Sequence, residues 1–269
     1  MTSRRPKRLI AATVLAVTGL LLASVGPASS AGTDKRPPKP TVVLVHGAFA
    51  DASGWNGVIE RLQDDGYPVI APANPLQSLP TDAAYISSVL DTITGPVILV
   101  GHSYGGAVIT NAANGHANVK ALVYIAAFAP DQGDTVASLT GKFPGSRLEA
   151  NLLVRPTPAG ADGYVKPEAF RTVFAGDVSW HDASVMAATQ RPANVAIPQT
   201  PSGPPAWKTI PSWYAVATND QVIPAEAERF MAKRANAKTI EIKGSSHVAM
   251  ISHDKTSTDL IKAAAKATR

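Results

Sequence analysis

Cysteine is absent from the 269-residue sequence. Its absence excludes a lipoprotein anchor, a thiol nucleophile and thiolate metal sites, and it is compatible with export because a chain of this length needs no disulfides. An HExxH motif and the glycine patterns of dinucleotide-binding and phosphate-binding loops are also missing. The sequence therefore predicts a protein without a metal or an organic cofactor.

Acidic residues are missing from the first 31 positions, which hold the four bases Arg4, Arg5, Lys7 and Arg8. The whole chain has 25 Lys and Arg against 20 Asp and Glu, so residues 32–269 carry a net charge of only +1. The basic isoelectric point thus reflects the leader, and a nucleic-acid partner is not expected.

The first 31 residues have the pattern of a secretory signal peptide. An uncharged apolar run at 9–24 follows the basic residues, and small residues precede a cleavage site expected after Ala31. The alternative is a membrane anchor, for which the run is short. We expect a secreted protein with no stable membrane anchor after cleavage and one domain at 32–269, which is long enough for a full core.

Apolar runs alternate with amphipathic segments along the rest of the chain, and there are no internal repeats. Expected strands are 41–47, 67–72, 96–101, 120–128, 212–218 and 238–243, and expected helices are 55–65, 82–93, 104–114, 224–235 and 255–267. This alternation predicts an α/β fold with a doubly wound parallel sheet. Residues 131–210 break the rhythm with many Pro and Gly residues, some helical pattern around 167–191 and no clear strand. We expect this segment to be a lid inserted into a core of 41–130 and 211–269.

The pattern G-x-S-x-G occurs at Gly101–Gly105, between an expected strand and an expected helix. It is typical of a nucleophile elbow, where a strained turn presents a serine hydroxyl and where neighbouring side chains would collide. We expect Ser103 to be the nucleophile. The helix that follows directs its amino end at the site and favours developing negative charge.

A serine hydroxyl needs a base, and that base needs an acid to orient it. His247 follows the last expected strand on a Gly-Ser-Ser turn, and Asp220 follows the strand before it. We predict these two residues as base and acid. The alternatives are His253, better explained as a surface or helix-capping residue, and Asp131, better explained as a turn residue.

An oxyanion hole requires two backbone N–H donors. The first is expected from Tyr104, which follows the nucleophile, and the second from Ala48, with Phe49 as the alternative. His46 and His102 flank these positions, and we expect them to support the loop and the elbow rather than to react.

The stretches VLVHGAF, GHSYGG, ATNDQVIP and SSHVAM together resemble the α/β-hydrolase superfamily, in particular the branch of plant methyl esterases, hydroxynitrile lyases and small bacterial esterases. The resemblance implies Ser103, Asp220 and His247 as a triad, Ala48 and Tyr104 as the oxyanion hole, and a site under the lid. Two departures are clear: the two leading strands of the superfamily are missing, which leaves a six-stranded core, and Val248 occupies the position where the lyases have a Lys.

The predicted function is that of a secreted serine hydrolase that cleaves carboxylic esters through an acyl-enzyme, with an apolar small-molecule ester of open acyl and alcohol size as its substrate. Alternatives are perhydrolysis or lyase chemistry by the same triad, and ligand binding without turnover. Large side chains of the lid either pack on the core or face the substrate; they are Tyr164, Phe170, Phe174, Trp180, Met186 and Trp207. The sequence leaves the exact ester and the oligomeric state open.

Overall fold

The computed structural model describes residues 38–158 and 160–268, so the expected signal peptide at residues 1–31 lies outside the described residues. The described residues form one compact unit. Within the described ranges, no helix is both long and apolar enough to cross a membrane.

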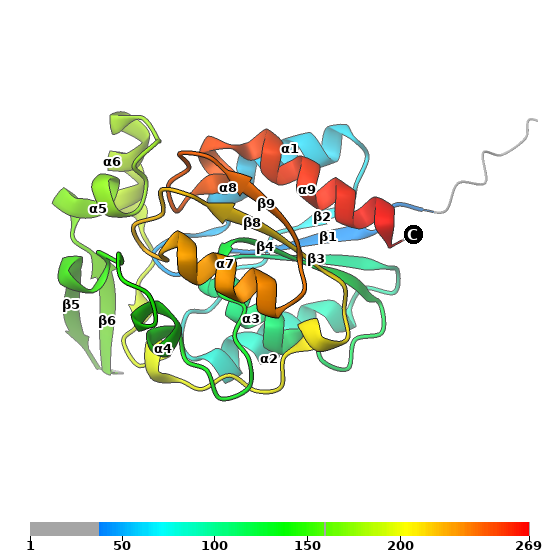
Figure 1. Cartoon of the computed structure of the whole chain (residues 1–269), viewed down its shortest axis with the longest axis horizontal. Coiled ribbons are helices and arrows are strands. Elements are labelled where there is room, and N and C mark those ends of the chain that lie inside the picture. Colours follow the sequence, from blue (N-terminus) through cyan, green and yellow to red (C-terminus); the bar gives the residue numbers. More distant parts are fainter. Residues whose placement is uncertain (1–37, 159, 269) are drawn as a thin grey trace, which may run out of the picture. The chain divides into compact units, whose positions relative to one another are not determined.

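A six-stranded sheet with the order β2-β1-β3-β4-β8-β9 runs through this unit (Figure 1). Every neighbouring pair is parallel. The strands are β1 (Thr41–Val45), β2 (Val69–Ile70), β3 (Val97–Ser103), β4 (Val119–Ala127), β8 (Ser212–Ala217) and β9 (Lys238–Ile242). The Val, Ile and Leu side chains of β1 and β3 are fully buried, as continuous apolar strands require when both faces of a sheet are covered. The predicted doubly wound parallel sheet is confirmed.

Helices cover both faces of this sheet. Figure 1 shows α1, α8 and α9 on one face and α2, α3 and α7 on the other. Their bounds are α1 (Asn56–Asp64), α2 (Leu79–Asp91), α3 (Tyr104–Ala112), α7 (Ala225–Arg234), α8 (Ala249–Ser252) and α9 (Asp254–Ala267). Because the six strands are parallel, their carboxyl ends meet at one edge, where sites form in such folds.

Helix α2 begins three residues earlier than the sequence pattern indicates. The hydroxyl of Ser78 accepts the N–H of Thr81 at 3.3 Å, and Pro80 lies in the first turn. A serine cap followed by proline stabilises a helix start at this position.

Helix α7 has acidic residues in its first turn and basic residues in its last turn. Glu226 is exposed near the amino end, and Lys233 and Arg234 lie in the last turn. Glu228 is fully buried between the helix and the sheet.

Residues 131–210 contribute no strand to the central sheet and form a second sheet with the order β5-β6-β7. The strands β5 (Leu152–Thr157), β6 (Gly160–Val165) and β7 (Ala193–Asn194) are antiparallel. The prediction that this segment has no clear strand is therefore wrong. Strand propensity is low because Pro156, Gly160 and Gly163 are residues that strands avoid, and the hairpin is held by the pairing of β5 with β6.

The remaining elements are short. The helical pattern expected around 167–191 appears as two separate helices, α5 and α6. The helices of the insertion are α4 (Val136–Gly141), α5 (Pro167–Val173) and α6 (Trp180–Thr189), and the 3-10 helices of the chain are η1 (Ala52–Trp55), η2 (Glu149–Asn151), η3 (Ile197–Gln199) and η4 (Ala206–Lys208).

Candidate active site

Ser103 lies at the turn between the end of β3 and the start of α3. Its backbone has φ 54° and ψ −126°, a conformation that is costly for a residue with a side chain. Such strain persists only where the surrounding structure enforces it, and here a buried strand and a buried helix fix both ends of the turn.

The glycines on either side of Ser103 are required by close backbone contacts. A methyl group at Gly101 would lie 2.6 Å from the carbonyl oxygen of Gly105, and one at Gly105 would overlap the carbonyl oxygen of Val45. Neither neighbour is a flexible side chain, so neither can move aside cheaply. The expected steric reason for the G-x-S-x-G pattern thus applies to these contacts.

Ser103, His247 and Asp220 lie in one hydrogen-bonded row. The Oγ of Ser103 is 2.8 Å from Nε2 of His247, and Nδ1 of His247 is 2.5 Å from Oδ2 of Asp220. The side chains of His247 and Asp220 are fully buried. Three segments that are far apart in the sequence therefore meet at the carboxyl edge of the sheet, in the geometry by which a base can take the proton of a hydroxyl.

Backbone donors hold the carboxylate of Asp220 in place. Its Oδ1 accepts the N–H groups of Val222 at 2.6 Å and Ile223 at 2.9 Å, while Oδ2 faces His247. Three donors therefore point at one carboxylate and fix its direction. An anion at this position can orient the imidazole ring and stabilise the imidazolium.

The two alternative residues lie in other contacts. Nε2 of His253 is 3.5 Å from Oδ2 of Asp177, and His253 directly precedes α9. Oδ1 of Asp131 is 2.6 Å from the ammonium group of Lys208. Among the hydrogen bonds of the described residues, neither His253 nor Asp131 contacts Ser103 or His247.

Ala48 and Tyr104 line the same cavity as Ser103. Among the loop and turn hydrogen bonds between backbone groups of residues 38–158 and 160–268, none has the N–H of Ala48 as its donor, and Tyr104 is the first residue of α3, where N–H groups have no partner within the helix. Phe49, the alternative donor, also lines the cavity and has φ 62°. The assignment of the second oxyanion donor to Ala48 rather than Phe49 remains a prediction.

His46 and His102 are buried neutral rings that fix the loops around Ser103. Nδ1 of His46 donates to the carbonyl of Gly47, and its Nε2 accepts the N–H of Asn74, both at 2.9 Å. Burial lowers the pKa of His46 and lowers the pKa of His102 well below its usual value. His102 acts on the base rather than on its own turn, because its Nε2 donates to the carbonyl of His247 at 2.9 Å.

Two acidic side chains at the site were not singled out from the sequence. Asp177 of the insertion accepts the N–H of Ser246 at 3.0 Å, directly before His247. Glu228 lies against Asp220. The sequence contains one signal for Glu228, because this residue lies between Ala227 and Met231 on the apolar stripe of α7. A charged residue on such a stripe is rarely buried without a partner, so its position indicates a buried polar contact.

The cavity at Ser103 has a volume of about 180 Å³ and a mostly aliphatic wall. The insertion supplies Val136, Leu148, Leu152 and Ile197 to this wall. The six large side chains considered from the sequence do not line it. Phe170 and Phe174 are buried in the core, and the ring of Phe174 packs 5.0 Å from that of His247, so packing explains them.

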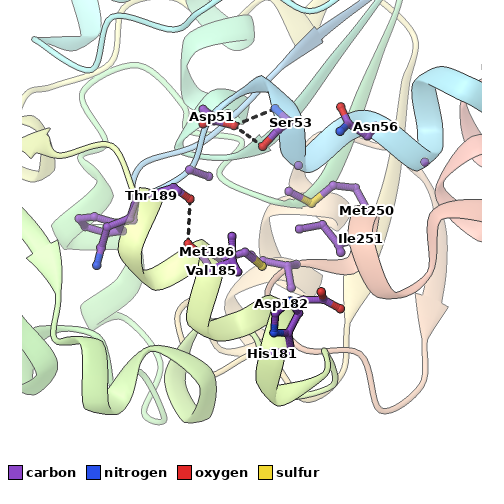
Figure 2. Close-up of a pocket in the computed structure, with 16 residues that line it drawn as sticks. Asp51, Ser53, Asn56, His181, Asp182, Val185, Met186, Thr189, Met250 and Ile251 are labelled. Atoms are coloured by element: carbon purple, nitrogen blue, oxygen red, sulfur yellow. Dashed lines mark hydrogen bonds between the residues drawn. The ribbon is translucent and has the colours of Figure 1, made fainter.

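A larger cleft of about 400 Å³ lies beside this cavity. Figure 2 shows Asp51, Ser53 and Asn56 on one side and α6 residues such as His181 and Met186 on the other. Ser103 does not line this cleft, whereas Phe49 lines both spaces. Phe49 is thus a side chain that the walls of the cleft and the cavity share.

Metal ligands do not gather in the described part of the chain, where no group of three His, Asp or Glu residues is placed to hold an ion.

Comparisons with known proteins identify relatives of this fold and site. A family model described as the alpha/beta hydrolase family matches residues 42–258. A pyrethroid hydrolase from Sphingobium wenxiniae is 30% identical over 214 residues, which are 71% of this chain and 75% of that protein. The crystal structure of a pyrethroid hydrolase from Sphingobium faniae has a TM-score of 0.69 at 25% identity, covering 85% of this chain and 98% of that one. A methylesterase from Arabidopsis has a TM-score of 0.70 at 20% identity, covering 84% and 99%, a likeness of fold.

Proposed function

This chain belongs to the alpha/beta hydrolase family and is a hydrolase, and from that premise we propose that it cleaves carboxylic esters with Ser103, His247 and Asp220 as its catalytic triad. The observation that carries the proposal is the hydrogen-bonded row, with 2.8 Å from Ser103 to His247 and 2.5 Å from His247 to Asp220.

In the proposed mechanism the Oγ of Ser103 attacks the ester carbonyl carbon while Nε2 of His247 takes the hydroxyl proton. Asp220 stabilises the resulting imidazolium through Nδ1. The carbonyl oxygen becomes an oxyanion, which the N–H groups of Tyr104 and Ala48 stabilise by about 3 kcal/mol each, as in sites of this kind. The C–O bond to the alcohol then breaks, and the alcohol leaves with the proton of His247.

The second half of the reaction releases the acid from the acyl-enzyme. His247, again neutral, takes a proton from a water molecule, and the hydroxide attacks the acyl carbon on Ser103. The second oxyanion collapses, the bond to Oγ breaks, and His247 returns the proton to Ser103. Water is consumed, and one acid and one alcohol are produced.

The cavity favours a small, apolar substrate. Its volume of about 180 Å³ is below the roughly 300–1,000 Å³ of pockets that enclose drug-sized ligands. The aliphatic wall from the insertion has no charged group that would pair with an anionic substrate. We therefore expect esters with short, apolar acyl groups to be preferred, and we propose that the insertion is a lid over the site.

The test compares the wild type with Ser103→Ala on p-nitrophenyl esters of increasing acyl length. The variant is expected to lose at least about 10⁴-fold in kcat, as removal of a triad member does. Ser88→Ala is the matched control, because Ser88 is exposed on α2 and donates only to the carbonyl of Tyr85. Hydrolysis by Ser103→Ala at the wild-type rate refutes the mechanism, as does failure of a serine-directed phosphonate to label Ser103 in the wild type.

Export is a separate part of the proposal, supported by the signal-peptide pattern of residues 1–31. Expression of the full chain in a bacterial host should release a protein that begins at Gly32 into the periplasm or medium. A full-length chain retained in the cytoplasm or membrane fraction would contradict export with cleavage.

A further inference from the structure

Glu228 presents a carboxyl group inside the protein, directly behind the acid of the proposed triad. Its side chain is fully buried on the inner face of α7. Its Oε2 accepts the N–H of Ala217 at 3.1 Å, beyond the last paired residues of β4 and β8. Its Oε1 is buried and receives no hydrogen bond from any donor among the described residues.

Glu228 and Asp220 meet at Ala217, whose N–H donates to Oε2 of Glu228 at 3.1 Å and whose carbonyl accepts the N–H of Asp220 at 3.3 Å. Both side chains are buried there, and the charge of Asp220 acts on Glu228. Two ionised carboxylates so close in a buried site repel each other, so one of them holds a proton. Asp220 receives three hydrogen bonds, from Val222, Ile223 and His247, whereas Glu228 receives one. The negative charge is therefore more stable on Asp220 and the proton more stable on Glu228.

Among the described residues, no cation forms a salt bridge with Glu228. Arg229, its neighbour on α7, is turned to the surface, where it pairs with Glu226 and Glu241 at 2.7 Å each. His247, which is bonded to Asp220, and Tyr214 of β8 are further titratable groups near the pair. Burial raises the pKa of Tyr214 well above its usual value. Burial, together with the charge of Asp220, likewise raises the pKa of Glu228 well above its usual value.

We propose that Glu228 is a positioning residue: a neutral carboxylic acid that accepts from Ala217 through Oε2 and donates a hydrogen bond from Oε1 to Asp220. The role rests on the proposed function of Asp220 as the acid of a triad. Glu228 adds no charge to the His247–Asp220 pair, and it gives Asp220 one more donor that fixes the direction of its carboxylate. The unpartnered Oε1 is thereby accounted for, because a protonated oxygen is a donor and Asp220 is its acceptor.

Two substitutions of Glu228 separate this role from simple space filling. Glu228→Gln keeps both hydrogen bonds, since its amide oxygen can accept from Ala217 and its NH₂ group can donate to Asp220. Glu228→Met has a similar volume and keeps neither bond. Glu226→Gln is the matched control, because it removes an exposed carboxylate two residues away on the same helix.

The readouts are kcat and the pH profile of kcat/KM on the best p-nitrophenyl ester. Glu228→Met should lose roughly tenfold in kcat, the effect of a lost hydrogen bond to a charged group. The acid limb of its kcat/KM profile should move upward by about half a pH unit, because the charge of Asp220 is less dispersed. Glu228→Gln should recover most of the lost kcat and keep the acid limb of the wild type. Glu226→Gln should match the wild type in both readouts.

An ionised Glu228 gives a different outcome and overturns the proposal. It would favour the imidazolium form of His247, so Glu228→Gln would then move the acid limb to lower pH by roughly half a unit or more. A kcat for Glu228→Gln as low as that of Glu228→Met would also overturn it. If Glu228→Met does not fold, Glu228→Gln alone decides between the two charge states.

A measurement without substrate keeps this test separate from the proposed function. In protein carrying ¹³C at the glutamate carboxyl carbons, the Glu228 resonance, assigned by its loss in Glu228→Gln, should keep the chemical shift of a protonated acid at pH 7. The shift of a carboxylate at pH 7 overturns the proposal. If the wild type cleaves no ester but this resonance is that of an acid, the proposed function fails while the assignment of the proton to Glu228 stands.

Discussion

Asp177 is the residue through which the insertion holds the loop of the proposed base. It lies between α5 and α6, and its Oδ2 accepts the N–H of Ser246 at 3.0 Å while its Oδ1 accepts the hydroxyl of the same residue. His253 adds a contact at 3.5 Å. Since Ser246 directly precedes His247, we predict that Asp177→Ala weakens both the stability of the protein and its activity.

The expected magnitude follows from these contacts. A hydrogen bond to a charged group contributes about 1.5–3 kcal/mol, and two such bonds are lost, although the carboxylate of Asp177 is partly exposed and therefore partly screened by water. We expect the free energy of unfolding to fall by about 2–3 kcal/mol, which is roughly 4–12 °C in Tm for a domain of this size. We expect kcat to fall by about tenfold because the His247 ring is held less firmly, with a smaller change in KM.

Urea denaturation at several pH values checks the stability and its cause. Partial burial opposes ionisation of Asp177, but the bonds from Ser246 prevail and hold its pKa below the usual value. This stabilisation is present above the pKa of an unfolded Asp and is lost as the pH falls through the lower, folded value, so the deficit of Asp177→Ala should shrink below about pH 4. The control is Asp182→Ala, because Asp182 is exposed on α6 and bonds only within the turn of Ser179. The reasoning is refuted if Asp177→Ala unfolds within 0.5 kcal/mol of the wild type, roughly the scatter of neutral surface substitutions, and keeps its kcat.

Three further substitutions have defined outcomes. Gly105→Ala should lower the free energy of unfolding by about 2 kcal/mol or more in urea, because the new methyl group overlaps the carbonyl of Val45, whereas Gly141→Ala has open space and should be neutral. Glu228→Gln should gain stability relative to the wild type as the pH rises from 4 to 7. The raised pKa of Glu228 makes the wild type lose stability above the pKa of an unfolded Glu, whereas the variant has no proton to lose. A difference in stability that does not change with pH would contradict this. The lowered pKa of His102 predicts that the free energy of unfolding of the wild type falls by up to about 1.4 kcal/mol per pH unit below pH 6.5. The reason is that the unfolded ring takes up a proton and the folded ring does not. His102→Gln should show a smaller pH dependence in the same denaturation series.

The central sheet could be predicted from the sequence because its signals are local. The strand that ends at Ser103 is a run of Val, Ile and Leu, and the expected bounds of β1, β3, β4, β8 and β9 differ from the observed ones by at most two residues. The hairpin of β5 and β6 could not be predicted in this way. Its residues have weak strand propensity, and its stability comes from a partner strand whose position the local pattern does not contain.

The candidate site likewise has residues that the sequence predicts and residues that it does not. The positions of Ser103, Asp220 and His247 follow from a short motif and from the ends of strands, which parallel topology brings to one edge. Asp177 and Glu228 belong to no sequence motif. Each is a single acidic residue whose side chain contacts the site only in the folded protein. Whether an acidic residue is buried depends on the packing of α7 or the insertion against the core, and that packing is a property of the whole fold.

Burial favours the neutral form of three titratable groups around the site. It keeps His46 and His102 neutral by lowering their pKa values, and it keeps Glu228 protonated by raising its pKa. Three donors point at the carboxylate of Asp220 and fix its direction. In the proposed mechanism the imidazolium of His247 therefore forms against a single, fixed negative charge, with the neighbouring rings and the Glu228 acid supplying hydrogen bonds and no competing charge. Buried dipoles that do not have to reorient stabilise a developing charge more effectively than water does. The burial of three titratable groups in neutral form therefore favours formation of the His247 imidazolium in the proposed mechanism.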